Sequence, residues 1–215
     1  MLSWSSINTV LLDMDGTLLD LSYDNYFWRT YLPERYAEHK SISIEESHEY
    51  IGTLSERLHG SLDWYCLDYW SDDLGMDIEA LKKEVNHLVK MRPHVPEFLN
   101  WLNASGKEVM LVTNAHPKAL AIKSEASELH LHLDRHISSH EFSLAKENDG
   151  FWKKLEARED IDLKTSLLID DSMSVLKQAE AEGVGHILQM LHPDSTLDVR
   201  AKSHFPGIVH FNELM

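Results

Sequence analysis

The sequence has a single cysteine, Cys66, among its 215 residues. One thiol cannot form an intramolecular disulfide, so a reducing compartment is expected. No apolar run approaches the roughly 18 to 20 residues that a membrane-spanning helix needs. The N-terminal segment also lacks the basic start and the long apolar stretch of a signal peptide. These absences favour a cytoplasmic protein with no membrane partner.

Basic residues are scarce in this chain. There are 20 Lys and Arg against 36 Asp and Glu, which gives a formal net charge of −16, and no basic run occurs. This balance argues against nucleic acid or an anionic membrane as a partner. It would also repel a phosphorylated substrate, so a site for such a substrate needs local cations. A small-molecule ligand and a monomer or small homo-oligomer are expected.

Short apolar segments alternate with amphipathic helical segments along most of the chain. The pattern predicts strands at residues 10–12, 109–112, 136–139, 167–169 and 186–188, the last of these closing the series. Apolar strands that alternate with helices predict an α/β fold, with a parallel sheet covered on both faces.

Residues 20–91 interrupt this alternation with an all-helical block. Ser43 begins a capping-box sequence. Asp77 is a plausible N-cap for one helix that carries apolar residues as far as Val89. The chain therefore divides into residues 1–19 and 92–215, which form the sheet domain, and residues 20–91, which are inserted after the first strand.

A pair of acids follows the first predicted strand, in Asp13-Met14-Asp15-Gly16-Thr17. Two carboxylates at i and i+2 after a buried strand are typical of an aspartate nucleophile beside an acid/base aspartate. The alternative is an ordinary turn, because Asp and Gly are common turn residues.

Three further polar signals appear downstream in a fixed order. Thr113-Asn114 follows the second strand, Lys146 lies in a later loop, and Asp170-Asp171 follows the fourth strand. Each of these three signals alone could be an ordinary turn or a set of solvated charges. Together they are expected to meet at one site, because open α/β sheets bind ligands at the carboxyl ends of their strands.

These motifs resemble the four signature motifs of the haloacid dehalogenase superfamily, most of whose members are phosphatases. The resemblance covers nearly the whole chain and is nearest to the bacterial GMP/IMP 5′-nucleotidases of that superfamily, through residues 24–28, 64–70, 111–117 and 168–172. It implies a Rossmann-like core with an inserted helical cap, formed by residues 20–91. One departure is Ala145-Lys146, where a Pro-Lys pair is expected.

The resemblance assigns a role to each catalytic group. Asp13 is expected to attack phosphorus and form an aspartyl-phosphate. Asp15 is expected to act as acid and then as base, and to be kept protonated by the neighbouring aspartates. Thr113, through its hydroxyl, and Asn114, through its backbone N–H, are expected to hold phosphate oxygens. Lys146 balances the negative charge.

A Mg²⁺ cofactor is implied by the same cluster, because this ion prefers oxygen ligands and keeps several waters. The expected ligands are the Asp13 side chain, the Asp15 carbonyl and Asp171. Asp170 is expected to support the site or to bind through water. Gly16 is expected to let the backbone turn close to the phosphate.

Substrate selection is expected in the helical block. Its aromatic residues are either cap core or a stacking surface for a purine, and helical spacing favours the core for most of them. Asp20, Asn25 and Arg29 are predicted to contact the base or ribose. Four clustered histidines have no spacing typical of a metal site, and a surface helix end is the better interpretation; they are His130, His132, His136 and His140.

The predicted function is therefore a Mg²⁺-dependent 5′-nucleotidase for purine monophosphates such as GMP and IMP. The alternatives are a phosphatase for sugars and other small molecules, or a phosphomutase of the same superfamily. A phospho-acceptor signalling domain also combines acids, Thr and Lys around Mg²⁺. It lacks both the acid at i+2 and the inserted block.

Overall fold

A six-stranded, fully parallel sheet forms the centre of the molecule. The computed structural model describes residues 2–133 and 135–215, and the strand order is β3-β2-β1-β4-β5-β6. The strands are β1 Thr9–Leu12, β2 Glu108–Thr113, β3 His136–Ser138, β4 Ser166–Asp170, β5 His186–Met190 and β6 Gly207–Ile208. The first five strands confirm the prediction. The sixth was missed because two residues, one of them glycine, carry no hydrophobic pattern.

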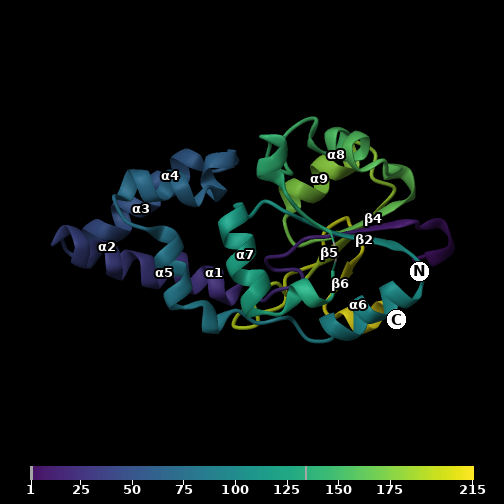
Figure 1. Ribbon diagram of the computed structural model, residues 1–215, viewed down its shortest axis with the longest axis horizontal. Coiled ribbons are helices and arrows are strands. Elements are labelled where there is room, and N and C mark those ends of the chain that lie inside the picture. Colours follow the sequence, from purple (N-terminus) through teal and green to yellow (C-terminus); the bar gives the residue numbers. More distant parts are fainter. Residues whose placement is uncertain (1, 134) are drawn as a thin grey trace.

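Helices cover both faces of the sheet, as the fold prediction requires. On one face Leu12 packs in a cluster with Phe98 of α6 (Val95–Ala104) and with Phe211 near the C-terminus. On the other face Leu11 packs with residues of α8 (Phe151–Glu159) and α9 (Met173–Ala181). Figure 1 shows α8 and α9 on the opposite side of the sheet from α6. Successive residues of a strand point to opposite faces, which explains the two clusters.

A block of helices lies between β1 and α6 in the sequence. It comprises α1 Ser22–Tyr26, α2 Leu32–Lys40, α3 Ile44–Leu58, α4 Leu67–Leu74 and α5 Ile78–Glu84, with a π-helical turn Phe27–Tyr31 joining α1 to α2. Both predicted helix starts are confirmed: Ser43 forms the capping box with Glu46, and Asp77 caps α5. The single helix expected through Val89 was wrong, because α5 ends at Glu84 and a 3-10 turn follows.

The two chain crossings between the sheet and the helical block run side by side. Leu19 forms an antiparallel bridge with Met91. The Asp20 N–H donates to the Lys90 carbonyl at 2.9 Å, and the Arg92 N–H donates to the Leu18 carbonyl at 2.9 Å. A paired two-segment connection at these positions supports our interpretation of residues 20–91 as a cap.

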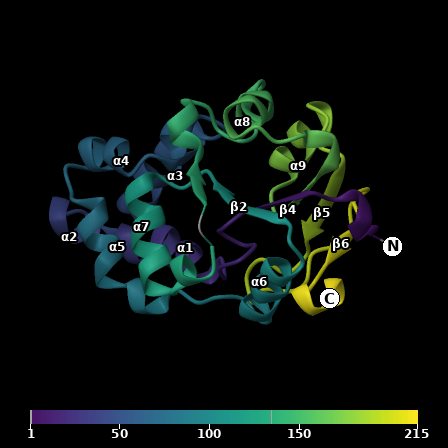
Figure 2. The ribbon, with the colours of Figure 1, turned by 45° about the vertical axis from the view of Figure 1, so that its right-hand side comes forward.

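Helix α7 (Pro117–Ala126) belongs to the sheet domain but packs against the cap. It contacts α5 and the 3-10 turn Asn86–Leu88, and Figure 2 shows it between the cap helices and the strands. Residues at its start and along its inner face can therefore reach both parts. No helix in the described part of the chain combines the length and the apolar character that crossing a bilayer requires.

Two glycines give a matched test of how tightly the chain packs around each of them. A Cβ at Gly185 would lie 1.9 Å from the Lys164 carbonyl oxygen, whereas a Cβ at Gly52, in the middle of α3, would meet nothing within 4 Å. We expect Gly185→Ala to lower the free energy of unfolding by about 1–3 kcal/mol through overpacking. Gly52→Ala should raise it by about 0.5–1 kcal/mol through helix propensity. Chemical denaturation of both variants checks this, and an unchanged Gly185→Ala protein would contradict the packing described here.

Candidate active site

Three carboxylates meet at the carboxyl ends of β1 and β4. The register pairs Leu12 with Ile169, so Asp13 and Asp170, the next residue on each strand, become neighbours. Ligand oxygens of Asp13, Asp170 and Asp171 lie within 4.8 Å of one another, and all three residues are buried. The sheet itself therefore brings the first and last predicted motifs together.

A buried lysine lies between two of these acids. The Lys146 ammonium donates to Asp13 Oδ1 at 2.5 Å, to Asp170 Oδ2 at 2.7 Å and to the Val112 carbonyl at 3.0 Å. Burial alone would lower the pKa of Lys146, but attraction to the two carboxylates outweighs burial and raises the pKa above its usual range. The ammonium is therefore charged at any working pH, as the sequence predicted for this position.

Asn114 fixes the loop that carries this lysine. Its side-chain oxygen accepts the Lys146 backbone N–H at 2.8 Å, and its amide donates to Glu147 Oε2 at 2.8 Å. The neighbouring Thr113 is buried, and its hydroxyl oxygen accepts the Ala115 N–H at 3.0 Å. That bond leaves the Thr113 hydroxyl hydrogen free to donate toward a ligand. Alanine at position 145, where the family resemblance implies proline, therefore does not displace the Lys146 ammonium.

The acid Asp15 lies in a different electrostatic setting from the one expected. Burial raises its pKa to about 6; Lys123 opposes this effect, while Asp24 and Asp13 add to it. The expectation that Asp13, Asp170 and Asp171 keep Asp15 protonated was thus only partly right. Burial is the main cause, and Asp24 of the cap takes the place of the two acids after β4.

Lys123 was not found by sequence reasoning, yet it connects the acid to the cap. Its ammonium lies 2.7 Å from Asp15 Oδ2 and 2.7 Å from Asp24 Oδ2, and Lys82 lies 3.1 Å from the other oxygen of Asp24. Lys82 and Lys123 are each no more than 3% exposed. No motif marks these lysines, because each is a single residue within a helix.

Arg200 is the second group that sequence reasoning missed. Its guanidinium donates to Asp171 Oδ2 at 3.0 Å and to the Asp171 carbonyl at 2.9 Å from an irregular segment after β5. Burial, reinforced by repulsion from Asp13, raises the pKa of Asp171 to about 7 in spite of this partner. Burial likewise raises the pKa of Asp13 to about 6.

The arrangement of these acids fits a divalent cation. Both oxygens of Asp170 already accept hydrogen bonds, one from Lys146 and one from the Ser172 N–H at 2.8 Å, which matches a supporting role. Asp13 and Asp171 retain carboxylate oxygens whose mutual repulsion a cation would relieve. A Cβ at Gly16, where φ is +84°, would lie 2.8 Å from Asp171 Cγ. Only glycine therefore leaves room beside the cluster.

The acids open into a cavity of about 1000 Å³ between the sheet domain and the cap. Its lining includes the candidate catalytic groups and four aromatic residues of the helical block, Trp28, Trp64, Tyr65 and Trp70. Two other aromatic residues of the block, Tyr23 and Phe27, are buried, in line with the expectation of cap core.

Of the three residues predicted to contact the base or ribose, two line the cavity and one does not. Asn25 and Arg29 line the cavity, although the Asn25 amide donates to Asp194 at 2.6 Å. Asp20 is not part of the lining. Its carboxylate accepts the Ser22 N–H at 2.9 Å and the Ser195 N–H at 3.2 Å, so it holds two loops together. The structure therefore does not bring Asp20 to the ligand.

The raised pKa of Asp171 predicts how stability depends on pH without metal. The folded protein holds this proton more tightly than the unfolded chain, so the free energy of unfolding falls as pH rises from the usual 3.8 through about 7. Asp171→Asn removes this effect. In EDTA, the melting temperature of the variant should exceed that of the parent protein by a margin that widens from about pH 4 to about pH 8. Adding Mg²⁺ at the higher pH should then stabilise only the parent protein, and a constant margin would contradict the assignment.

Comparisons with known proteins identify the family and the fold. A family model described as haloacid dehalogenase-like hydrolase matches residues 7–181. The chain is 38% identical over 214 residues to "GMP/IMP nucleotidase YrfG" of Escherichia coli (strain K12), covering 100% of this chain and 96% of that protein. A phosphatase structure from Thermococcus onnurineus superposes with a TM-score of 0.78 at 20% identity, covering 97% and 96% of the two chains.

A magnesium-bound structure of the putative hydrolase YfnB from Bacillus subtilis superposes with a TM-score of 0.66 at 16% identity, over 97% of this chain and 96% of that one. At these identities the two structures support the fold. The family match and the full-length relative go further, and they leave no support for a phospho-acceptor signalling domain. The chain is an enzyme that belongs to the haloacid dehalogenase-like hydrolases.

Proposed function

We propose that this protein is a Mg²⁺-dependent 5′-nucleotidase that hydrolyses purine monophosphates such as GMP and IMP through an aspartyl-phosphate on Asp13. The observation that carries the proposal is the Asp13 carboxylate, held by Lys146 at one end of the cavity, with a second carboxyl of raised pKa two residues on. The 38% identical relative, described as a GMP/IMP nucleotidase, supports the substrate class.

In the first step an Asp13 carboxylate oxygen attacks phosphorus, and the bond from phosphorus to the nucleoside oxygen breaks. Asp15, when protonated, donates its proton to that leaving oxygen. Its pKa of about 6 lies near the range in which a general acid is most effective. Its Oδ1 is buried and has no hydrogen-bond partner within residues 2–133 and 135–215, so this oxygen is available to the ligand.

In the second step Asp15, now ionised, takes a proton from a water molecule. The water oxygen attacks the phosphorus of the aspartyl-phosphate, the bond to Asp13 breaks, and inorganic phosphate leaves. Thr113 and Lys146 donate hydrogen bonds to the phosphoryl oxygens or to Asp13 throughout. A Mg²⁺ held by Asp13, Asp171 and the Asp15 carbonyl would supply positive charge to the phosphoryl group.

We assign recognition of the nucleoside to aromatic residues that line the cavity. Trp28 and Trp64 come from the cap and line the same space as the catalytic groups. A volume of about 1000 Å³ is large enough for a nucleotide. Flat aromatic surfaces stack on bases, and a purine offers a larger face than a pyrimidine.

A panel of phosphomonoesters tests the proposed substrate class. With phosphate release as the readout and Mg²⁺ present, kcat/KM should be highest for GMP and IMP and lower for pyrimidine nucleotides and sugar phosphates. Asp13→Asn should lower every rate by more than about a thousandfold, because the nucleophile is lost. Asp198→Asn, an exposed acid, serves as the control. A preference for sugar phosphates would overturn the nucleotidase assignment, and an active Asp13→Asn enzyme would overturn the nucleophile.

The acid role of Asp15 is tested by the leaving group. Asp15→Asn should slow phosphate release from GMP by about 10²–10⁴-fold, the usual worth of a general acid. With p-nitrophenyl phosphate, whose leaving group needs no proton, the same variant should release a rapid burst of nitrophenol before the slow second step. Equal impairment of the first step with both substrates would show that Asp15 is not the acid.

A further inference from the structure

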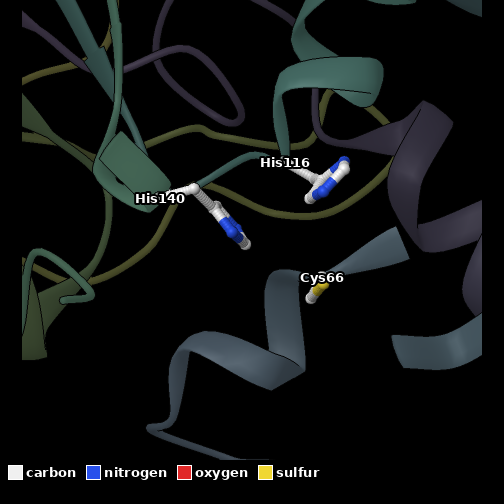
Figure 3. Close-up of side chains that lie close together, drawn as sticks. All are labelled: Cys66, His116 and His140. Carbon is white, nitrogen blue, oxygen red and sulfur yellow. The ribbon is translucent and has the colours of Figure 1, made fainter. Parts of the chain in front are cut away.

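A second group of potential metal ligands lies outside the phosphate site. Cys66, His116 and His140 each offer a ligand atom, and these atoms lie within 4.8 Å of one another. Figure 3 shows the three side chains around one space, each coming from a different segment. Cys66 directly precedes α4 of the cap, His116 precedes α7, and His140 lies in the 3-10 turn Ser139–Phe142.

The rings of His116 and His140 lie close together, and Nδ1 of His116 accepts the Lys118 backbone N–H at 3.4 Å. Their ring centroids are 5.0 Å apart and the rings are nearly perpendicular, at 85°. Nε2 of His140 is buried and has no hydrogen-bond partner among the residues that the structure describes. The backbone of Asn114 lies beside the same ring. A metal-binding histidine characteristically has one nitrogen on the metal and the other on a carbonyl or carboxylate.

A carboxylate completes the surroundings of the other ring. Asp68 Oδ2 lies 3.7 Å from His116 Nε2, and Lys118 holds the second oxygen of Asp68 at 2.7 Å. A metal ion binds the neutral form of each ring.

The chemistry of these donors differs from that of the aspartate cluster. One thiolate and two imidazole nitrogens select borderline or soft ions such as Zn²⁺ and Co²⁺, whereas the carboxylates select Mg²⁺. We propose that Cys66, His116 and His140 form a second metal site, which takes Zn²⁺ or a similar thiol-binding divalent cation. A fourth position would be left for water, because three protein ligands are typical of an open zinc site.

The proposed metal site lies between the cap and the sheet domain. Cys66 belongs to the helical block, while His116 and His140 belong to the sheet domain, so a bound ion joins the two. His116 also lines the substrate cavity. A bound metal ion would therefore hold the cap at a fixed distance from the sheet and restrict the entry and release of substrate and product. Of the four clustered histidines in the sequence, His140 is the one that contributes, together with two residues distant in the chain.

Cobalt binding tests the site without reference to turnover. Metal-free protein in excess Mg²⁺, which occupies the aspartate cluster, is titrated with Co²⁺ and followed by absorption spectroscopy. We expect one equivalent to bind with a thiolate-to-cobalt charge-transfer band. Because Cys66 is the sole cysteine, that band can come from no other residue.

Variants decide between this site and adventitious binding. Cys66→Ser should abolish the band, and His140→Gln should weaken Co²⁺ binding by more than about tenfold, or roughly 1.4 kcal/mol. His130→Gln, which changes an exposed histidine, is the control and should bind like the parent protein. Circular dichroism of each variant shows that it is folded. Absence of the band in the parent protein, or equal cobalt affinity in parent and His140→Gln, would overturn the proposal whatever the substrate proves to be.

Discussion

One buried ammonium group holds the acids of the active site together. Lys146 lies between Asp13 and Asp170, at the ends of two adjacent strands, and is almost fully removed from solvent. Without it, these carboxylates and Asp171 would be like charges in a medium of low dielectric, which is unfavourable. The charge balance explains how a chain of net charge −16 can present a site for an anionic substrate. The Asn114 side chain holds the loop that carries this lysine.

A second buried cation, the Lys123 ammonium, connects Asp15 to the cap. Lys123 of α7 binds both Asp15 and Asp24, and Asp24 is bound in turn by Lys82. Asp15 therefore shares a cation with the helical block, so displacement of the block would change the electrostatic setting of Asp15. Tyr65 of the block adds a further connection through its hydroxyl, which donates to Glu147 at 2.8 Å, next to Lys146. These contacts connect the helical block directly to the residues around Asp15 and Lys146.

Much of this arrangement could be predicted from the sequence, for a physical reason. Parallel strands place the residues that follow them at one edge of the sheet, so motifs after β1, β2 and β4 had to converge. Lys123 and Arg200 could not be predicted, because one is an ordinary residue of a helix and the other lies in an irregular segment. Their partners depend on how distant segments pack. The same limit applies to Asp20, whose proximity to the cap in sequence suggested ligand contact, whereas folding directs its carboxylate to backbone N–H groups.

The proposed mechanism requires that Asp13 becomes covalently phosphorylated during turnover. The most direct measurement uses Asp15→Asn protein mixed with p-nitrophenyl phosphate and Mg²⁺, quenched in acid and digested for mass spectrometry. We expect a phosphoryl group on the peptide that contains Asp13, with the modification assigned to that residue by fragmentation. Release of nitrophenol with no phosphorylated peptide, or with the phosphoryl group on another residue, would contradict it.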